Sequence, residues 1–113
     1  MLIIEAIGNL GSDPEMKYLA DGREMTTLSI ACNKGKGDDR ITSWVNCVVF
    51  GKPAETIYNY AKKGDKIFLR GDANPDKETG EPRIWEGKNG VTHATYEMVV
   101  KDFEFLGNKK GGE

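Results

Sequence analysis

The sequence predicts a single all-β domain, and two observations carry this prediction. Apolar and polar residues alternate along most of the 113-residue chain, as they do on strands that bury one face. Turn-forming residues interrupt this alternation repeatedly, whereas a helical period occurs in one short segment only. A hydrophobic content of 38% is sufficient for one modest core. We therefore expect one domain over residues 1–107 and a short, frayed polar tail over residues 108–113.

The first half of the chain is expected to form three strands. Residues 1–10 begin with a β-branched apolar run and end at a glycine-marked bend, after which residues 12–22 continue as a bent strand. Residues 23–33 and 41–50 alternate and are expected to be the second and third strands. The glycine-rich, charged residues 34–40 connect them, so this pair is expected to be a long hairpin.

The second half begins with the one expected helix, residues 53–61, which has a proline in its first turn. Its apolar residues at helical spacing are Ala54, Ile57, Tyr58 and Ala61. Residues 65–73 return to alternation as the fourth strand, and turn residues fill 74–82. Residues 83–107 are expected to be a hairpin turning at Lys88-Asn89-Gly90, where Asn-Gly supplies the positive φ of a two-residue turn. The second arm of this hairpin is the last strand.

This order of elements is that of the OB-fold, a five-stranded Greek-key barrel, here with one short helix between strands three and four. Barrels of this kind bind oligonucleotides on a sheet face and its loops. They also hold oligosaccharides or act only as protein contacts, so the fold alone does not give the function.

The third strand carries the most informative pattern. Trp44 and Phe50 share one parity of residues 41–50, whereas Val45, Cys47 and Val49 share the other. The aliphatic face can fill a core by itself, so the large rings are expected to point outward. Aromatic rings on an outer sheet face, with cations near in sequence, are typical of a stacking platform for unpaired bases.

Charge and chemistry limit the alternatives. The formal net charge is only −2, and mixed charge of this kind is equally typical of an ordinary solvated surface, so the aromatic pattern carries the nucleic-acid hypothesis. His93 is the only histidine, the two cysteines lack the spacing of a zinc site, and no phosphate-binding loop motif is present. We therefore expect no enzymatic activity, no metal and no cofactor.

The two cysteines, Cys32 and Cys47, have apolar neighbours and are both expected in the core. A secreted domain of this size more often carries a larger disulfide framework, and no signal peptide precedes the first apolar run. No apolar stretch is long enough to span a bilayer. A cytoplasmic protein, associated with the nucleoid if it binds DNA, is the expectation.

Four segments resemble the bacterial single-stranded DNA-binding protein family and together cover nearly the whole chain. They are GNLGSDPEMKY, SWVNCVVFGKPAE, YAKKGDKIFLRG and TYEMVVKDFEFLG, in the order that the family has. The resemblance implies a homotetramer of OB-folds that wraps single-stranded DNA with little sequence preference in replication, recombination and repair. It implies contacts from stacking aromatics and from lysines and arginines.

The resemblance also implies particular site residues. Trp44, Phe50 and Trp85 match stacking positions, although Trp85 has the alternative of packing across an exposed hairpin. Lys52, Lys63 and Arg83 match cationic positions that contact phosphates. Weaker candidates, each equally explained as a solubility charge, are Arg23, Lys34, Lys36 and Arg70.

The chain departs from the family pattern in three places. The 34–40 hairpin is short and lacks a tryptophan, residues 74–82 are an insertion, and nothing after Lys110 resembles the acidic tip that recruits replication and repair proteins. Recruitment through such a tip is therefore not expected. Two alternatives stay open: a primosome-type OB-fold protein that bridges replication proteins, and, more weakly, a cold-shock-like RNA chaperone. The sequence leaves host, phage or plasmid origin, dimer or tetramer, and binding-site size undetermined.

Overall fold

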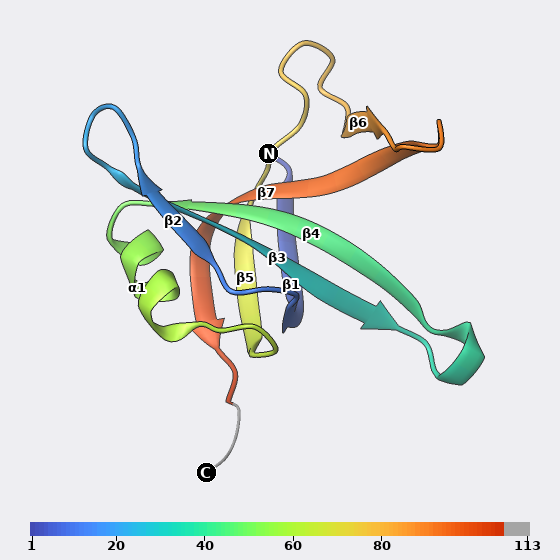
Figure 1. The fold of residues 1–113 in the computed structure, drawn as a ribbon, viewed down its shortest axis with the longest axis horizontal. Helices are drawn as coiled ribbons and strands as arrows, with labels where there is room; N and C mark the ends of the chain where they lie inside the picture. The colour runs from blue at the N-terminus through green and yellow to red at the C-terminus, as the bar shows by residue number, and fades with distance from the viewer. Residues whose placement is uncertain (108–113) are drawn as a thin grey trace.

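Five strands close into a barrel in the computed structural model, which describes residues 1–107 (Figure 1). Their hydrogen-bonded order is β1 (Ile3–Leu10), β5 (Lys66–Ala73), β7 (Thr92–Phe105), β4 (Ile41–Phe50) and β3 (Glu24–Lys34), and β3 pairs back onto β1. The pairing of β4 with β7 is parallel, and the other pairings of the ring are antiparallel. This closed all-β barrel confirms the predicted OB-fold.

The first predicted strand bends, as expected, and the bend divides it in two. After β1 the chain turns through residues 11–14 and continues as β2 (Glu15–Tyr18), which pairs with the beginning of β3. The helix α1 (Lys52–Tyr60) therefore follows the fourth strand in this numbering, at the place where the sequence predicts it after strand three. A short 3₁₀ turn, η1 (Gly37–Asp39), forms the tip of the β3–β4 hairpin.

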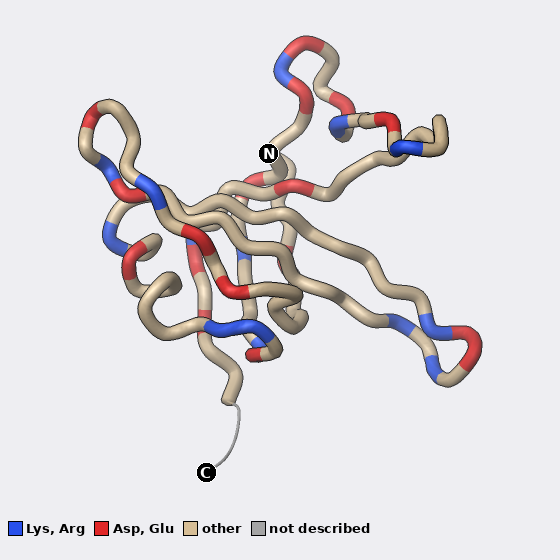
Figure 2. The backbone as a smooth tube through the Cα atoms, in the orientation of Figure 1, with Lys and Arg blue, Asp and Glu red and all other residues tan. Residues whose placement is uncertain are grey.

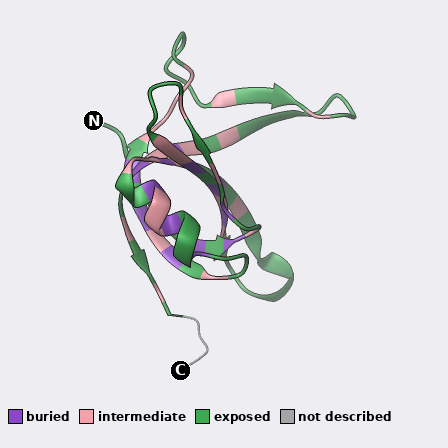
Figure 3. Ribbon diagram, turned by 60° about the vertical axis from the view of Figure 1, so that its left-hand side comes forward, coloured by how far each residue is buried: buried purple, intermediate pink, exposed green. Residues whose placement is uncertain are grey.

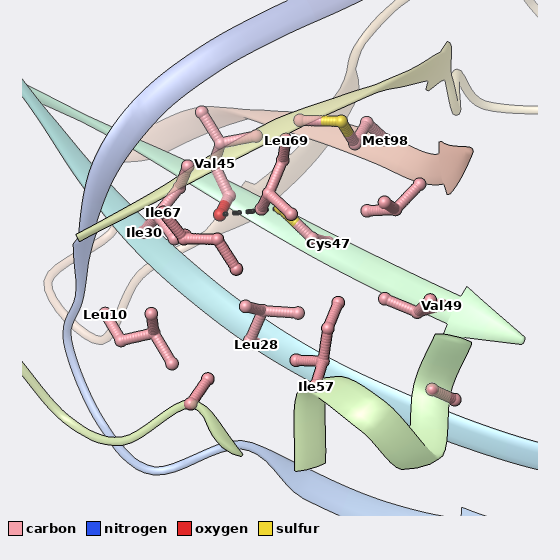
Figure 4. Packing of buried hydrophobic residues seen from close by; sticks show 13 residues of the cluster. Leu10, Leu28, Ile30, Val45, Cys47, Val49, Ile57, Ile67, Leu69 and Met98 are labelled. Atoms are coloured by element: carbon pink, nitrogen blue, oxygen red, sulfur yellow. Dashed lines mark hydrogen bonds between the residues drawn. The ribbon is translucent and has the colours of Figure 1, made fainter. Parts of the chain in front are cut away.

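The barrel core is built from the inward parity of the five barrel strands (Figure 4). Its fully buried members include Ile30 from β3, Val49 from β4, Ile67 and Leu69 from β5, and Met98 from β7. Burying such a side chain stabilises the fold by about 1.5–3 kcal/mol. The alternation that predicted these strands is thus the alternation between core and solvent.

The helix α1 lies against β2, β3 and β4 at one end of the barrel (Figure 3). Ala54 and Ile57 are completely buried beneath it, and the hydroxyl of Thr26 donates a 2.8 Å hydrogen bond to the carbonyl of Ala54. Tyr58 shares the helical spacing of this apolar stripe and was expected in the core or at an interface. It is 44% exposed at the edge of the stripe and so does not belong to the core. The predicted stripe is therefore narrower than its spacing indicated.

Two further expectations are corrected. The last hairpin turns at the expected residues, but Gly87 N–H donates to the Val91 carbonyl, leaving a three-residue loop in which Gly90 has φ of +81°. Three-residue loops commonly place glycine at this position, so the two-residue turn was wrong. Cys47 is buried as expected, but Cys32 is only half-buried, since it lies where β3 leaves the barrel and packs at the edge of the core.

The segment between β5 and β7 projects away from the barrel (Figure 1). Residues 74–82, where the sequence comparison with the family pattern predicts an insertion, are folded back by hydrogen bonds from the Gly80 amide to the Asp76 carbonyl and from the Asn74 amide to the Glu97 carbonyl. They lead into β6 (Arg83–Glu86), which pairs with the outer part of β7. This arm extends on the same side of the barrel as the β3–β4 hairpin, as Figure 1 shows. The predicted tail, residues 108–113, lies outside the described residues.

Candidate nucleic-acid interface

The outer face of β4 carries the two aromatic residues that the sequence placed there. Trp44 is 50% exposed and Phe50 is half-buried, whereas Val45, Cys47 and Val49 are each no more than 5% exposed. The strand is unbroken and pairs with β3 over its whole length. The register on which the sequence argument depended is therefore the one that forms.

Trp44 is supported from below by the bend between β1 and β2. A Cβ atom placed on Gly11 would lie 2.6 Å from Cζ3 and 2.8 Å from Cη2 of the indole. The ring therefore lies directly against the glycine backbone, an approach that no other residue type allows. Gly11 is a residue that the sequence argument used only as a turn signal.

Trp85 belongs to the projecting arm and is held at two points. Its ring stacks on His93, the residue opposite it on β7, with centroids 4.5 Å apart and planes inclined by 22°. Its indole Nε1–H donates a 2.7 Å hydrogen bond to the hydroxyl of Thr95. The cross-strand packing considered for Trp85 is thus present, yet 53% of the residue remains exposed.

Trp44 and Trp85 line one open groove of about 490 Å³, although β4 and β6 bring them from separate parts of the chain. The parallel pairing of β4 with β7, in which Val45 is opposite Tyr96, sets the arm beside β4. The other lining residues are Thr42, Ser43, Asn46, His93, Ala94, Thr95 and Tyr96. Aromatic walls with hydroxyl and amide groups between them can hold a flat, hydrogen-bonding ring.

Phe50 lies at the other end of β4 and is covered by an arginine. The Arg23 guanidinium carbon is 5.4 Å from the Phe50 ring centroid, a cation–π geometry. Asp21 holds Arg23 in place, because its carboxylate accepts hydrogen bonds from the Arg23 amide at 3.1 Å and from Nε at 2.9 Å. These two bonds lower the pKa of Asp21. A base that stacks on this face of Phe50 must either displace the Arg23 guanidinium or stack on it.

The surface between Trp44 and Phe50 is hollowed and acidic. A second groove of about 510 Å³ is lined by Asp13, Glu15 and Glu97 together with hydroxyl and amide side chains. Arg83 is half-buried and forms a 2.9 Å ion pair with Glu97. Phosphates are repelled by such a lining, so a bound strand is expected to turn its bases rather than its backbone toward it.

The remaining candidate cations lie around this face rather than within it. Lys34 and Lys36 flank the tip of the β3–β4 hairpin, and Lys52 begins α1. Lys63 lies in the loop after α1, where its amide donates to Asp13 Oδ1. Arg70 lies on β5, two strands from β4, and pairs with Glu5 of β1 at 3.3 Å. In Figure 2 the middle of β3 and of β4 carries neither blue nor red, while charge gathers at their ends.

Gly11, His93 and Thr95 are among the residues of this face that were not sequence candidates. His93 was placed on a strand without a role, because the predicted two-residue turn at Asn89-Gly90 sets Ala94 opposite Trp85, whereas the three-residue loop that forms brings His93 there. Within residues 1–107, three or more His, Cys, Asp or Glu side chains do not gather where they could hold a metal ion. No helix of that part of the chain is long and apolar enough to cross a membrane.

A small OB-fold barrel with aromatic rings on its outer sheet face defines a class of proteins that bind extended oligomers on that face. The family model described as the single-strand binding protein family matches residues 2–106, and the chain belongs to this family.

Individual relatives agree with the family match. The chain is 33% identical to Single-stranded DNA-binding protein 1 of Xylella fastidiosa (strain 9a5c), with 95% of this chain and 78% of that protein covered. It is 31% identical to the single-stranded DNA-binding proteins of Enterococcus faecalis (strain ATCC 700802 / V583) and Neisseria meningitidis serogroup A / serotype 4A. These matches cover 95% and 91% of this chain and 55% and 58% of the two proteins, so the chain spans little more than half of their length.

Proposed function

We propose that this chain binds single-stranded DNA without sequence preference and protects it during replication, recombination and repair. The observation that carries the proposal is the groove in which Trp44 and Trp85, both half-exposed, face the same space. Unpaired bases can stack on both rings, and each stacked base contributes about 1–3 kcal/mol. Selectivity is low because every base has a π-face. The names of the relatives support the same reading.

The phosphates are expected to follow the edge of this face. Lys34, Lys36, Lys52 and Lys63 are exposed around it and can neutralise phosphates without reading a base. Phe50 adds a stacking position once Arg23 moves or joins the stack. Arg83 and Arg70 are weaker contributors in this arrangement, because each already has a carboxylate partner. Binding of this kind requires no chemistry on the DNA, and we propose no enzymatic activity.

Assembly into a homotetramer is part of the proposal. The outward parity of β1 exposes Ile3 and Ile7, which border a hollow of about 490 Å³ that also includes Tyr96. An apolar edge of this kind is suited to a second copy of the chain. The expected mass in solution is four times the 12.5 kDa of one chain. A cytoplasmic, nucleoid-associated location fits the free thiols of Cys32 and Cys47.

The proposal is tested by titrating tryptophan fluorescence with oligo(dT) at two salt concentrations. Saturable quenching is expected, and log affinity should fall by about 0.7 per phosphate contact for each tenfold rise in salt. Trp44→Ala should weaken binding by about 5- to 150-fold, which is the loss of one stacked base. The matched control is Tyr60→Ala, since Tyr60 is a 69% exposed aromatic residue on α1, away from the groove. Equal losses in both variants, or no binding by the parent protein, would contradict the proposal.

A further inference from the structure

The groove that holds Trp44 and Trp85 has an electrostatic feature that the proposed function leaves unexplained. Among the described residues that line it, none is Lys or Arg. A strand whose bases enter this groove brings phosphates with it, and the cations described above lie outside the groove. Lys34, Lys36 and Lys52 lie at the ends of β3 and β4, Lys63 follows α1, and Arg70 and Arg83 are already paired with carboxylates. Histidine is the one lining side chain that can become positively charged near neutral pH.

That side chain is His93, and its ring is held in a fixed place. One face stacks on Trp85, and its Nε2 edge lies beside Gly87, where an added Cβ would be 3.2 Å away. The residue is nevertheless exposed, and it lines the groove together with Trp85. The imidazole is therefore oriented, accessible and next to a ring on which a base can stack.

The charges around His93 are few. On the arm they are Glu86 of β6, Lys88 of the loop and, further along, the Arg83–Glu97 ion pair. Tyr96 is the other titratable residue that lines the groove. The β4 strand on the opposite wall contributes no charged residue, because its sequence is ITSWVNCVVF. A proton on His93 thus changes the net charge of the side chains that line the groove from zero to +1.

We propose that His93 is a DNA-contacting residue of this groove, whose protonated imidazole neutralises a phosphate next to a base stacked on Trp85. The inference rests on the proposed function. It assigns to the groove a phosphate contact that forms in mild acid and is absent at higher pH. Charge at an exposed position contributes modestly, so affinity for single-stranded DNA should be about two- to fivefold tighter at pH 5.5 than at pH 7.5.

The test measures oligo(dT) affinity at both pH values for the full chain and for His93→Gln and His93→Phe. Thymine carries no group that titrates in this range, and carboxylates that protonate in acid are identical in all three proteins. His93→Phe keeps an aromatic partner for Trp85 without a charge, and His93→Gln keeps a polar side chain. Only the parent protein should bind oligo(dT) more tightly at pH 5.5 by more than the change that both variants show. Its salt slope should also steepen by about 0.7 at pH 5.5, the value for one added contact.

The single histidine allows a second, reciprocal measurement. The chain has one imidazole, so its ring protons give a single pair of NMR signals whose pH midpoint can be followed with and without oligo(dT). Linkage requires that a two- to fivefold tightening raise this midpoint by about 0.3 to 0.7 pH units in the complex. An unchanged midpoint would overturn the inference.

The possible failures are distinguishable. If oligo(dT) binds but all three proteins respond equally to pH, His93 makes no such contact and the proposed function stands. If oligo(dT) does not bind at either pH, the proposed function is wrong, and this inference is wrong as well.

Discussion

Gly11 supports Trp44: the indole lies so close to the glycine backbone that a Cβ there would be 2.6 Å from Cζ3. Gly11 is itself fixed, because its amide donates a 3.0 Å hydrogen bond to the carbonyl of Ser29 on β3. The bend between β1 and β2 and the aromatic face of β4 are therefore one unit. A change at either residue moves the other.

Gly11→Ala should lift the Trp44 ring without unfolding the barrel. The backbone at Gly11 is anchored, so the side chain of Trp44 must give way, and its ring no longer occupies the orientation seen here. We expect weaker oligo(dT) binding by up to the 5- to 150-fold that corresponds to one stacked base, about 1–3 kcal/mol. Fluorescence titration measures this, with circular dichroism as the check on folding.

The control for this prediction is a double-mutant cycle with Trp44→Ala. If Gly11→Ala acts through the indole, it should have no further effect on affinity once the indole is removed. Additive losses would show that Gly11 acts on DNA binding by another route.

Asp21→Asn should release Arg23 from Phe50 and tighten binding slightly. The Asp21 carboxylate holds Arg23 through two hydrogen bonds. Asparagine can still accept from the Arg23 amide, but it loses the charge and the acceptor for Nε, so the guanidinium is free to reach a phosphate. Exposed ion pairs contribute little, so a gain of no more than about fivefold at low salt is expected, fading at high salt. Glu104→Gln removes the same charge at the far end of β7. Equal gains in both variants would mean that only net charge matters.

The two hydrogen bonds from Arg23 to the Asp21 carboxylate, here called the Asp21–Arg23 clasp, have a defined pH dependence. Its hydrogen bonds lower the pKa of Asp21 from the ordinary 3.8, so the carboxylate is charged and the clasp complete at neutral pH. The stabilisation is present above that ordinary value and is lost as pH falls through the lower folded value. Following the Arg23 Nε–H signal by NMR in the free protein checks this, and loss of the clasp well above pH 4 would contradict it.

Thr26→Val should loosen the helix from the barrel. Thr26 is completely buried and its hydroxyl donates to the Ala54 carbonyl, so valine removes this bond while keeping the volume. The free energy of unfolding should fall by about 0.5–1.5 kcal/mol, measured by urea denaturation. Thr27→Val, on the exposed face of the same strand, is the control and should cost less. Equal losses in the free energy of unfolding would mean that the change in strand propensity, and not the lost hydrogen bond, accounts for the effect of Thr26→Val.

The Cys47 thiol should not react with thiol reagents in the folded protein. Burial raises its pKa to about 12, so almost no thiolate exists at pH 8, whereas the half-buried Cys32 is partly accessible. Ellman's reagent should titrate no more than one thiol in the folded protein and two in denaturant. Two rapidly reacting thiols in the folded state would contradict the described burial.

The raised pKa of Cys47 also affects stability at high pH. The unfolded thiol ionises near 9.0 and the folded one near 12, so the folded state alone keeps its proton between these values. Stability is therefore complete below pH 9 and falls as pH rises, by at most about 1.4 kcal/mol per pH unit. Comparing urea denaturation of the parent and of Cys47→Ala from pH 8 to 10 should show a steeper fall in the parent.

Alternation along the strands was readable because it reflects only local geometry. Val45, Cys47 and Val49 point inward and Trp44 outward whatever the barrel's closure, since successive side chains of a strand point to opposite faces. The prediction for Cys32 was wrong where closure of the barrel matters. Cys32 has the core parity of β3 but lies one residue beyond Ala31, the last residue of β3 that pairs with β1.

The outward direction of Trp44 could be predicted from the sequence, whereas the residues that contact the candidate side chains could not. Three of these contacts depend on the register between strands or on the path of a loop. They are the ion pair of Arg83 with Glu97, the packing of Arg23 on Phe50 and the stacking of His93 on Trp85. The last hairpin illustrates this, because a three-residue loop in place of a two-residue turn changes which residues are opposite each other.

The sequence by itself determined the order of strands and helix, the face of β4 on which Trp44 and Phe50 lie, and the family to which their motifs point. Only the tertiary structure decided that Trp44 shares a groove with Trp85 and His93 rather than with Phe50. The physical reason is that a local period fixes the direction of each side chain, whereas the parallel pairing of β4 with β7 joins segments far apart in the chain. That pairing depends on closure of the whole barrel, which no local pattern encodes.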